Sequence, residues 1–204
     1  GMILPGNFIP LFEKSELIVK LDRYMFEHAC RWYRIHLERG GSPVSLAVNV
    51  SKAGLFQNDF VDFYTDIKDK YSVPDGVLEL EFTESMLAAD TELFAELVVN
   101  LNARGFICSL DDFGSGYSSL NLLKNLPIDV LKLDILFFHK SRDIRRERIV
   151  VSNVINMARE LNIKTIAEGV EDMDTVEFLR KAGCNVIQGY VFAKPCLRRI
   201  LNIC

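Results

Sequence analysis

The sequence predicts an α/β fold built on a parallel sheet, and three observations indicate it. Short runs of β-branched and aliphatic residues alternate strictly with helical segments along the chain. Polar residues recur at or near the carboxyl ends of these runs. The composition, 49% hydrophobic and 25% charged over 204 residues, is typical of a globular chain with a buried core. We therefore expect residues 1–204 to form a single domain.

A helix precedes the first strand. Apolar residues at three- and four-residue steps predict it from Phe8 to about Arg39, and a glycine pair ends it. These apolar positions are Leu17, Ile18, Leu21, Met25, Cys30, Trp32 and Ile35. The predicted strands are 45–50, 77–82, 106–111, 129–134, 163–168 and 185–189. The predicted helices between them are 58–70, 91–104, 118–125, 144–161 and 173–181, and a short helical run follows Pro195. Consecutive βα units of this kind form a parallel sheet.

A closed (β/α) barrel of the TIM type has eight strands, and six are visible here. We therefore expect a TIM-like barrel that is incomplete at its N-terminus, with about six of its eight strands present. The sheet edges of an unclosed barrel expose unpaired backbone groups. We expect self-association through such an edge, or through segment 112–125 with its apolar Leu120, Leu122 and Leu123.

Polar side chains stand at the ends of all six predicted strands. They are Asn49, Glu81, Asp111, Asp112, Lys132, Asp134, Glu168 and Gln188. The carboxyl ends of parallel strands open on one face, where ligands bind, so these groups should meet there. Carboxylates packed together repel one another and are costly to desolvate unless a cation lies among them. The pattern favours a metal-dependent site, although any one of these residues alone could equally be a solvated strand end.

The segment 111–120, DDFGSGYSSL, is the sharpest local signal. Adjacent residues at a strand end cannot face the same direction, so Asp111 and Asp112 can bind different cations, which suits a two-metal site. Gly114 and Gly116 favour a loop that can move. The alternative is an ordinary junction between strand, loop and helix, where glycine and serine are common.

Two further charged residues have two interpretations each. Lys132 either neutralises the neighbouring acids or orients a metal-bound water as a catalytic group. Glu171 either serves a site or begins the next helix, where the helix dipole favours an acid. The histidines do not build a site, because His28 and His36 fall in the first predicted helix and His139 in a loop.

The composition excludes several classes of function. A net charge of -4 and a pI near 5.5 argue against duplex nucleic acid as a partner. Five cysteines without CxxC spacing predict neither a disulfide framework nor a zinc site, and they fit a cytoplasmic location. No apolar stretch approaches the roughly 18 residues of a membrane span. The absence of GxGxxG, Walker, GxSxG and HExxH motifs weighs against dinucleotide, nucleoside triphosphate, serine hydrolase and zincin chemistry.

Seven motifs indicate a family that the chain resembles. In order they are FIPLFEKSELI, NVS, LELEFTES, DDFGSGYSSL, LPIDVLKLD, AEGVE and QGYVFAKP. Together they resemble the EAL-domain phosphodiesterases, which hydrolyse cyclic di-GMP to linear pGpG. The resemblance implies one EAL domain over residues 1–204 that lacks its first strands, including the Glu-Ala-Leu strand that names the family. Because that glutamate and a nearby arginine bind metal and phosphate in the family, we expect low turnover from these residues.

The resemblance also implies roles for the site residues. Asn49, Glu81 and Asp111 resemble ligands of a first divalent ion, Mg²⁺ or Mn²⁺. Asp111 then bridges to a second divalent ion that Asp112 also binds. Lys132 resembles the lysine that contacts the attacking water.

The remaining roles lie around this centre. Glu168 resembles the acid that acts as general base or orients the water. Glu84 resembles the acid that anchors the loop 112–118, which in the family couples metal binding to dimerisation. Asp134, Gln188 and Glu171 are expected behind the ligands or on the substrate side.

The leading interpretation is a metal-dependent cyclic di-GMP phosphodiesterase, acting as a cytoplasmic homodimer in bacterial signalling. An upstream cyclase or sensory domain in the full protein is compatible with this interpretation. The alternative is a noncatalytic cyclic di-GMP-binding or dimerisation module. A third interpretation is an inert fragment that folds by pairing its open edges with another copy.

Overall fold

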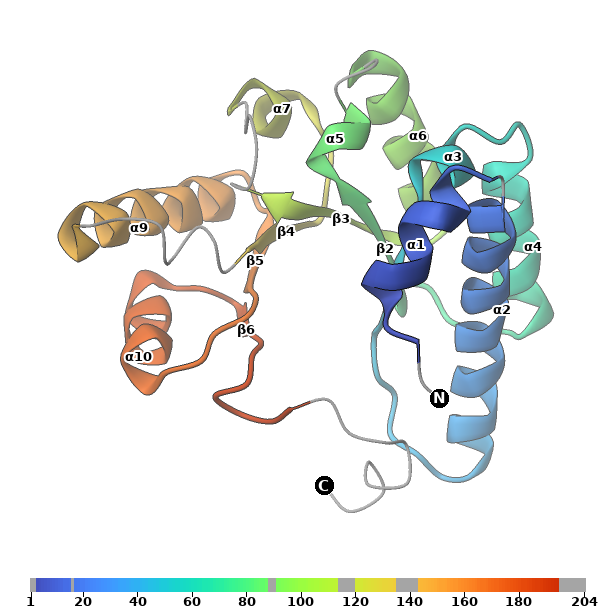
Figure 1. Ribbon diagram of the computed structural model, residues 1–204, viewed down its shortest axis with the longest axis horizontal. Coiled ribbons are helices and arrows are strands. Elements are labelled where there is room, and N and C mark those ends of the chain that lie inside the picture. The colour runs from blue at the N-terminus through green and yellow to red at the C-terminus, as the bar shows by residue number, and fades with distance from the viewer. Residues whose placement is uncertain (1–2, 16, 88–90, 114–119, 135–142, 195–204) are drawn as a thin grey trace. The chain divides into compact units, whose positions relative to one another are not determined.

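The computed structural model describes residues 3–15, 17–87, 91–113, 120–134 and 143–194. Helices and strands alternate through them (Figure 1), and six strands are hydrogen-bonded in the order β1-β2-β3-β4-β5-β6. The predicted α/β fold with six strands in sequence order is confirmed. The chain divides into two compact units. The first unit comprises Gly1–Leu110 and Ser119–Ile128, and the second comprises Asp111–Ser118 and Asp129–Cys204.

The first unit packs helices around strands β1 and β2. Its elements are α1 (Pro5–Glu13), α2 (Leu17–Glu38), β1 (Leu46–Asn49), α3 (Lys52–Leu55), α4 (Phe60–Lys70), β2 (Leu78–Thr83), α5 (Glu84–Leu87), α6 (Thr91–Ala103), the start of β3 (Ile107–Phe113) and α7 (Leu120–Asn125). Helices α2 and α4 lie side by side in Figure 1. Their contact is aromatic, because the Phe26 and Tyr64 ring centroids are 4.3 Å apart. Strand β2 adds Leu78, Leu80 and Phe82, all fully buried, to this core.

The predicted single helix from Phe8 to Arg39 is wrong, because two helices, α1 and α2, occupy this stretch. Helix α1 ends at Glu13, where the Ser15 hydroxyl donates to the Leu11 carbonyl and the Ser15 N–H donates to Phe12. A serine that bonds the preceding backbone in this way competes with continuation of the helix.

The apolar positions predicted for α2 are confirmed only in part. Ile18 and Cys30 are buried, whereas Leu17 and Met25 are 44% and 48% exposed, respectively. The buried positions form one stripe at three- and four-residue steps: Ile18, Asp22, Phe26, Cys30 and Tyr33. This stripe contains one acid, Asp22. It is buried because its aromatic residues pack against α4, where Phe26 contacts Tyr64.

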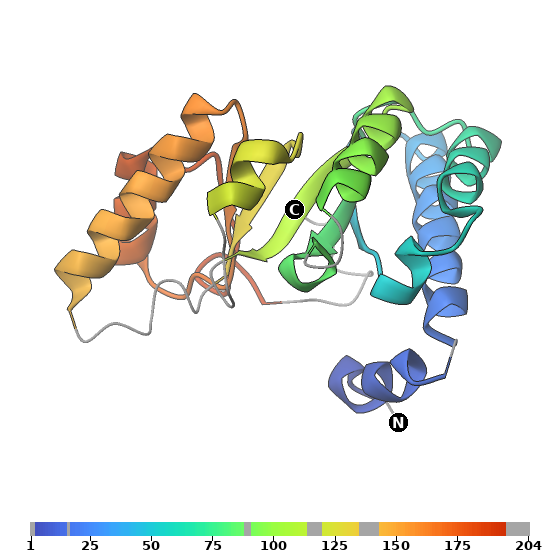
Figure 2. The ribbon, with the colours of Figure 1, turned by 90° about the horizontal axis from the view of Figure 1, so that it is seen from above.

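The second unit is a run of βα units. Its elements are the end of β3, β4 (Val130–Leu133), α9 (Ile144–Glu160), β5 (Lys164–Ala167), α10 (Met173–Ala182) and β6 (Val186–Ile187). Strands β4, β5 and β6 pair in parallel. Helices α9 and α10 lie beside each other in Figures 1 and 2. The side chains of Asp143 and Asp172 cap the two helices, and Gly183 ends α10 in the left-handed conformation.

Several element boundaries differ from those predicted. Strand β3 continues to Phe113, two residues beyond the prediction, and β6 spans only two residues. The short helices α3 and α5 were not predicted. The run after Pro195 lies outside the described residues. In the described part of the chain, no helix is both long enough and apolar enough to cross a bilayer.

The expectation that Leu123 supplies an association surface is wrong. Its side chain is 2% exposed and is buried in the first unit. Helix α7 packs against α6, so this leucine is used by the core of its own unit. The side chains of Leu120 and Leu122 lie outside the described part of the structure, and self-association stays a prediction.

Candidate active site

In the first unit, two predicted site residues are neighbours across a strand pair. Strands β1 and β2 are parallel, and their register places Asn49 directly opposite Glu81. The Val50 N–H donates to the Glu81 carbonyl at 3.1 Å, so the pairing continues past the end of β1. Glu81 is buried at 6% exposure, whereas Asn49 is exposed. The two residues are thus neighbours across the strand pair, and both carry side-chain oxygens of the kind that Mg²⁺ accepts.

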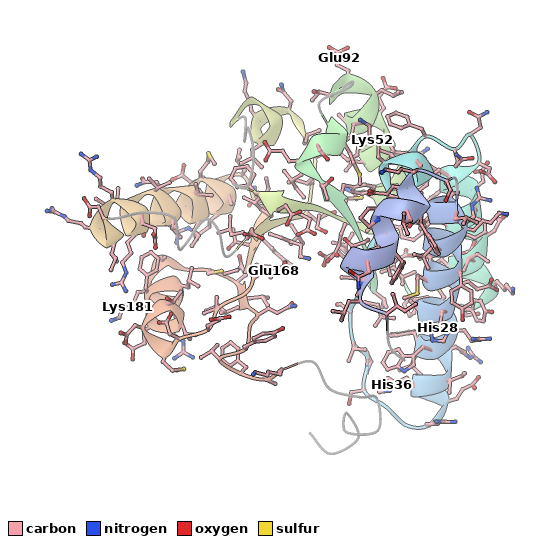
Figure 3. All side chains as sticks on the ribbon, in the orientation of Figure 1. His28, His36, Lys52, Glu92, Glu168 and Lys181 are labelled. Atoms are coloured by element: carbon pink, nitrogen blue, oxygen red, sulfur yellow. The ribbon has the colours of Figure 1, made fainter. Side chains whose placement is uncertain are left out.

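In the second unit, Lys132 lies between two of the predicted acids. Its Nζ is 2.7 Å from the Glu168 Oε1 and 3.6 Å from the Asp111 Oδ1. All four residues of β4 are buried, and Lys132 itself is 7% exposed. A buried ammonium needs such partners, because a buried charge without an opposite charge nearby is strongly destabilising. Figure 3 shows Glu168 just beyond the end of β5.

Asp111 and Asp112 form one local structure at the end of β3. The Asp112 backbone has a left-handed φ of 57°, and its N–H donates to the Asp111 Oδ1 at 2.9 Å. The Asp111 side chain is 15% exposed, whereas Asp112 is exposed. The two adjacent acids therefore differ in environment, as the alternation of a strand predicts.

The electrostatics of this group favour an added cation. Partial desolvation raises the pKa of Asp112, although the residue is exposed, and the carboxylates of Asp111, Asp134 and Glu168 raise it further, while Lys132 opposes them. Four acids thus face one ammonium, and the excess negative charge makes the ionised form of Asp112 costly. Cation binding would relieve this repulsion.

The donor chemistry fits Mg²⁺ or Mn²⁺, since every candidate ligand is an oxygen. Among the described residues, however, no three His, Cys, Asp or Glu side chains already form a group that could hold a metal ion. Lys132 is one physical reason, because its ammonium stands beside the Asp111 and Glu168 oxygens that a cation would approach.

The turn after β5 is held by backbone hydrogen bonds. The Glu168 N–H donates to Leu133, and the Val170 N–H donates to the Gln188 carbonyl at 3.1 Å. The Val191 N–H returns a bond to the Val170 carbonyl at 3.1 Å. These bonds fix the segment that carries Glu168, and they give Gln188 a backbone role.

Gly189 makes this arrangement possible, and sequence reasoning missed it. A Cβ at position 189 would collide with the backbone nitrogen, carbon and oxygen of Val170. Backbone atoms cannot move aside as the end of a side chain can. The available signal was the motif QGY, in which a glycine directly follows a strand.

Two other predicted site residues, Glu84 and Glu171, lie at or near the start of helices. Glu84 is the first residue of α5, and most of the loop that it is predicted to anchor lies outside the described residues. Glu171 does not begin a helix, contrary to one of its two interpretations. Asp172 is the N-cap of α10 and Asp174 is the acid of its first turn, because the Asp172 Oδ1 accepts the Thr175 N–H. Glu171 is exposed.

The histidines that the structure describes are engaged locally on α2, where Figure 3 labels both of them. His28 contacts the Arg31 guanidinium at 3.1 Å. His36 stacks on Trp32 and bonds the Ser42 carbonyl. His139 lies outside the described residues.

The structure therefore brings Asn49 beside Glu81, and it brings Lys132 to both Asp111 and Glu168. The predicted convergence of these two groups on a single site stays a prediction.

Comparison with known proteins relates this geometry to a family. Residues 1–195 match the family described as EAL domain. The chain is 37% identical over 195 residues to the bifunctional diguanylate cyclase/cyclic di-GMP phosphodiesterase MucR of Pseudomonas aeruginosa, covering 96% of this chain and 28% of that protein. It is 33% identical over 201 residues to the cyclic di-GMP phosphodiesterase PA2567 of the same species, covering 97% and 33%. The chain thus spans about a quarter to a third of the length of these relatives.

Solved structures share the fold. A complex of the phosphodiesterase PaMucR with c-di-GMP superposes with a TM-score of 0.90 at 37% identity, covering 98% of this chain and 81% of that one. The EAL domain of Mycobacterium smegmatis DcpA gives a TM-score of 0.82 at 32% identity, covering 90% and 83%. The fold is therefore that of the TIM-like barrel domains of this family.

Proposed function

The chain belongs to the EAL domain family, and from this premise we propose that it hydrolyses cyclic di-GMP to linear pGpG. The observation that carries the proposal is the buried Lys132 ammonium, held 2.7 Å from Glu168 and 3.6 Å from Asp111. A lysine and acids in contact at a strand end can hold and deprotonate a water molecule. Relatives named as cyclic di-GMP phosphodiesterases support the choice of substrate.

Two divalent ions, Mg²⁺ or Mn²⁺, are part of the proposal. Asn49, Glu81 and Asp111 would hold the first ion, and Asp111 would share the second with Asp112. When bound, such cations neutralise phosphate charge and lower the pKa of a coordinated water. The all-oxygen donor set and the raised pKa of Asp112 support this assignment.

Lys132 and Glu168 would act on the attacking water. The Lys132 ammonium donates hydrogen bonds and orients the water oxygen toward phosphorus. The Glu168 carboxylate, which contacts Lys132, accepts the proton that the water loses. The phosphorus–oxygen bond to the leaving ribose hydroxyl breaks as the water oxygen bonds to phosphorus, and the leaving oxygen takes up a proton. The carboxylates of the site repel the substrate phosphate, so the phosphate can bind only where a cation balances this negative charge.

The surrounding residues would support this centre. We assign Asp134 and Gln188 to positions behind the ligands, and exposed Glu171 to the substrate side. Glu84 would anchor the loop 112–118. We further propose that the domain acts in the cytoplasm as a homodimer. We also propose that it is joined to a cyclase or sensory domain, because the name of one relative combines a diguanylate cyclase with a phosphodiesterase.

The test is hydrolysis by the purified chain. Cyclic di-GMP is incubated with Mn²⁺ or Mg²⁺, and pGpG is quantified by chromatography. We expect product that requires the metal, and a loss of ~10²-fold or more in Lys132→Met, because a group that stabilises the reacting charge is removed. Lys181→Met is the matched control, since that ammonium is exposed on α10.

Two outcomes would contradict the proposal. Equal hydrolysis by Lys132→Met would remove the assigned role of the lysine. Binding of cyclic di-GMP in Ca²⁺ without any pGpG in Mg²⁺ or Mn²⁺ would favour the noncatalytic binding module instead.

A further inference from the structure

Helix α2 carries a buried acid that the proposed mechanism does not use. Asp22 lies in the apolar stripe of this helix and is only 8% exposed. Its Oδ2 accepts the backbone N–H of Ser51 at 3.0 Å. The two residues are 29 positions apart, so the bond ties the helix to the turn after β1.

That turn, residues 49–51, begins with the predicted metal ligand Asn49. The Ser51 hydroxyl accepts the Gly54 N–H at 3.0 Å and so caps the short helix α3. A Cβ at position 54 would lie 2.6 Å from the Asp22 Oδ2. Gly54 therefore leaves the space that the carboxylate occupies.

Burying the Asp22 carboxylate at this position disfavours its ionised form. Burial raises the pKa of Asp22, although hydrogen bonds from the Ser51 side chain and backbone act in the opposite direction. The Asp22 charge also acts on a buried tyrosine. The pKa of Tyr64 is raised, first by burial and then by the Asp22 carboxylate. The Tyr64 hydroxyl has no hydrogen-bond partner in the described part of the chain, so it does not compensate this charge.

The two residues that directly follow Asn49 are each held by a hydrogen bond. The Val50 N–H is bonded to the Glu81 carbonyl of β2. The Ser51 N–H is bonded to the Asp22 carboxylate. Only the second of these bonds comes from a side chain.

We propose that Asp22 is a positioning residue that fixes the turn 49–51 and thereby aims Asn49 at the metal. The inference rests on the proposed function, since it assumes that Asn49 is a ligand. Groups that orient metal ligands commonly affect metal affinity by about 10- to 100-fold without touching the metal.

The experiment measures Mn²⁺ affinity of the full chain by calorimetry, without substrate. We expect Asp22→Ala to weaken binding by about tenfold, and Asp22→Asn, which keeps an acceptor oxygen, to restore most of the affinity. Asp66→Ala is the matched control, because this acid is exposed on α4. A reduced unfolding temperature with unchanged Mn²⁺ affinity would overturn the proposal.

A double-mutant cycle separates positioning from general destabilisation. If Asp22 acts through Asn49, Asp22→Ala should add no further loss of Mn²⁺ affinity to Asn49→Ala. Full additivity would overturn the proposal. If Asp22→Ala does not fold, Gly54→Ala displaces the carboxylate instead, and the same loss of affinity is expected.

Failure of the proposed function gives a different pattern. A chain that binds Mn²⁺ with the predicted Asp22 dependence but makes no pGpG would retain the positioning role and lose the phosphodiesterase assignment. Mn²⁺ binding that Asn49→Ala leaves unchanged would overturn both the ligand and its positioning residue.

Discussion

The turn after β1 and the turn after β5 both carry a proposed site residue, but they are held in different ways. The first, residues 49–51, is tied by the Val50 backbone bond to Glu81 and by a side chain, the buried carboxylate of Asp22. The second, residues 168–170, is tied by backbone bonds to residues 188–191 around Gly189. A side chain can shift or be exchanged for a related one, whereas two backbones in contact leave no room for adjustment. We therefore expect graded effects at the first turn and abrupt effects at the second.

The largest effect is expected from Gly189→Ala. The new Cβ would collide with the Val170 backbone, so the turn that carries Glu168 must move. We expect a loss of about 3 kcal/mol in the free energy of unfolding, as for overpacked cores, measured by urea denaturation. Hydrolysis of cyclic di-GMP should fall at least ~10-fold, because misplacement of reacting groups is costly.

Gly6→Ala is the matched control for this substitution. Gly6 lies in α1, and nothing stands within 4 Å of an added Cβ. It should leave hydrolysis unchanged and raise stability by up to about 1 kcal/mol. Wild-type stability and activity in Gly189→Ala would show that the second turn is as adaptable as the first.

A smaller, pH-dependent effect is expected at the first turn. The folded pKa of Asp22 is raised above its ordinary value of 3.8, chiefly by burial. Its contribution to stability is therefore complete below pH 3.8 and is lost as pH rises through the folded pKa. Asp22→Asn does not titrate, so its stability relative to the wild type should increase with pH from about pH 4 upward.

Urea denaturation of the wild type and Asp22→Asn across this pH range measures the difference. The backbone bonds around Gly189 contain no titrating group and provide no comparable pH dependence. A difference that stays constant with pH would indicate that the Asp22 carboxyl titrates alike in the folded and unfolded chains.

The smallest effect is expected from Asp172→Ala. Asp172 accepts the Thr175 N–H and hydroxyl at 2.8 Å each and caps α10, just beyond the second turn. Loss of an N-cap costs about 1 kcal/mol in the free energy of unfolding. The rate of hydrolysis should stay unchanged, because the bonds of Val170 remain. Asp174→Ala is the control, and a large loss of activity in Asp172→Ala would mean that the helix, not Gly189, holds the turn.

The alternation of strands and helices was predictable because it depends on local apolar patterns. The contact of Lys132 with Asp111 and Glu168 followed from a single rule, that parallel strands end on one face. Asn49 opposite Glu81 followed from the same rule. These residues could be identified from the sequence because polar side chains recur at the ends of all six predicted strands.

Asp22 and Gly189 could not be found in the same way. The role of Asp22 depends on a partner 29 residues away, and the apolar positions predicted for α2 mixed its buried stripe with exposed residues. With the correct stripe, an acid between Ile18 and Phe26 would have been conspicuous. Gly189 acts by the absence of a side chain, and only the position of Val170 reveals why that absence matters.

At Asp112, the left-handed backbone and the proposed function favour different residues. Such a conformation costs most residues roughly 1–2 kcal/mol, while glycine adopts it freely and aspartate or asparagine tolerates it best. Glycine would therefore improve the fold here and delete a carboxylate from the proposed site. An aspartate at φ 57° therefore gives up some backbone stability and places a carboxylate at the proposed site.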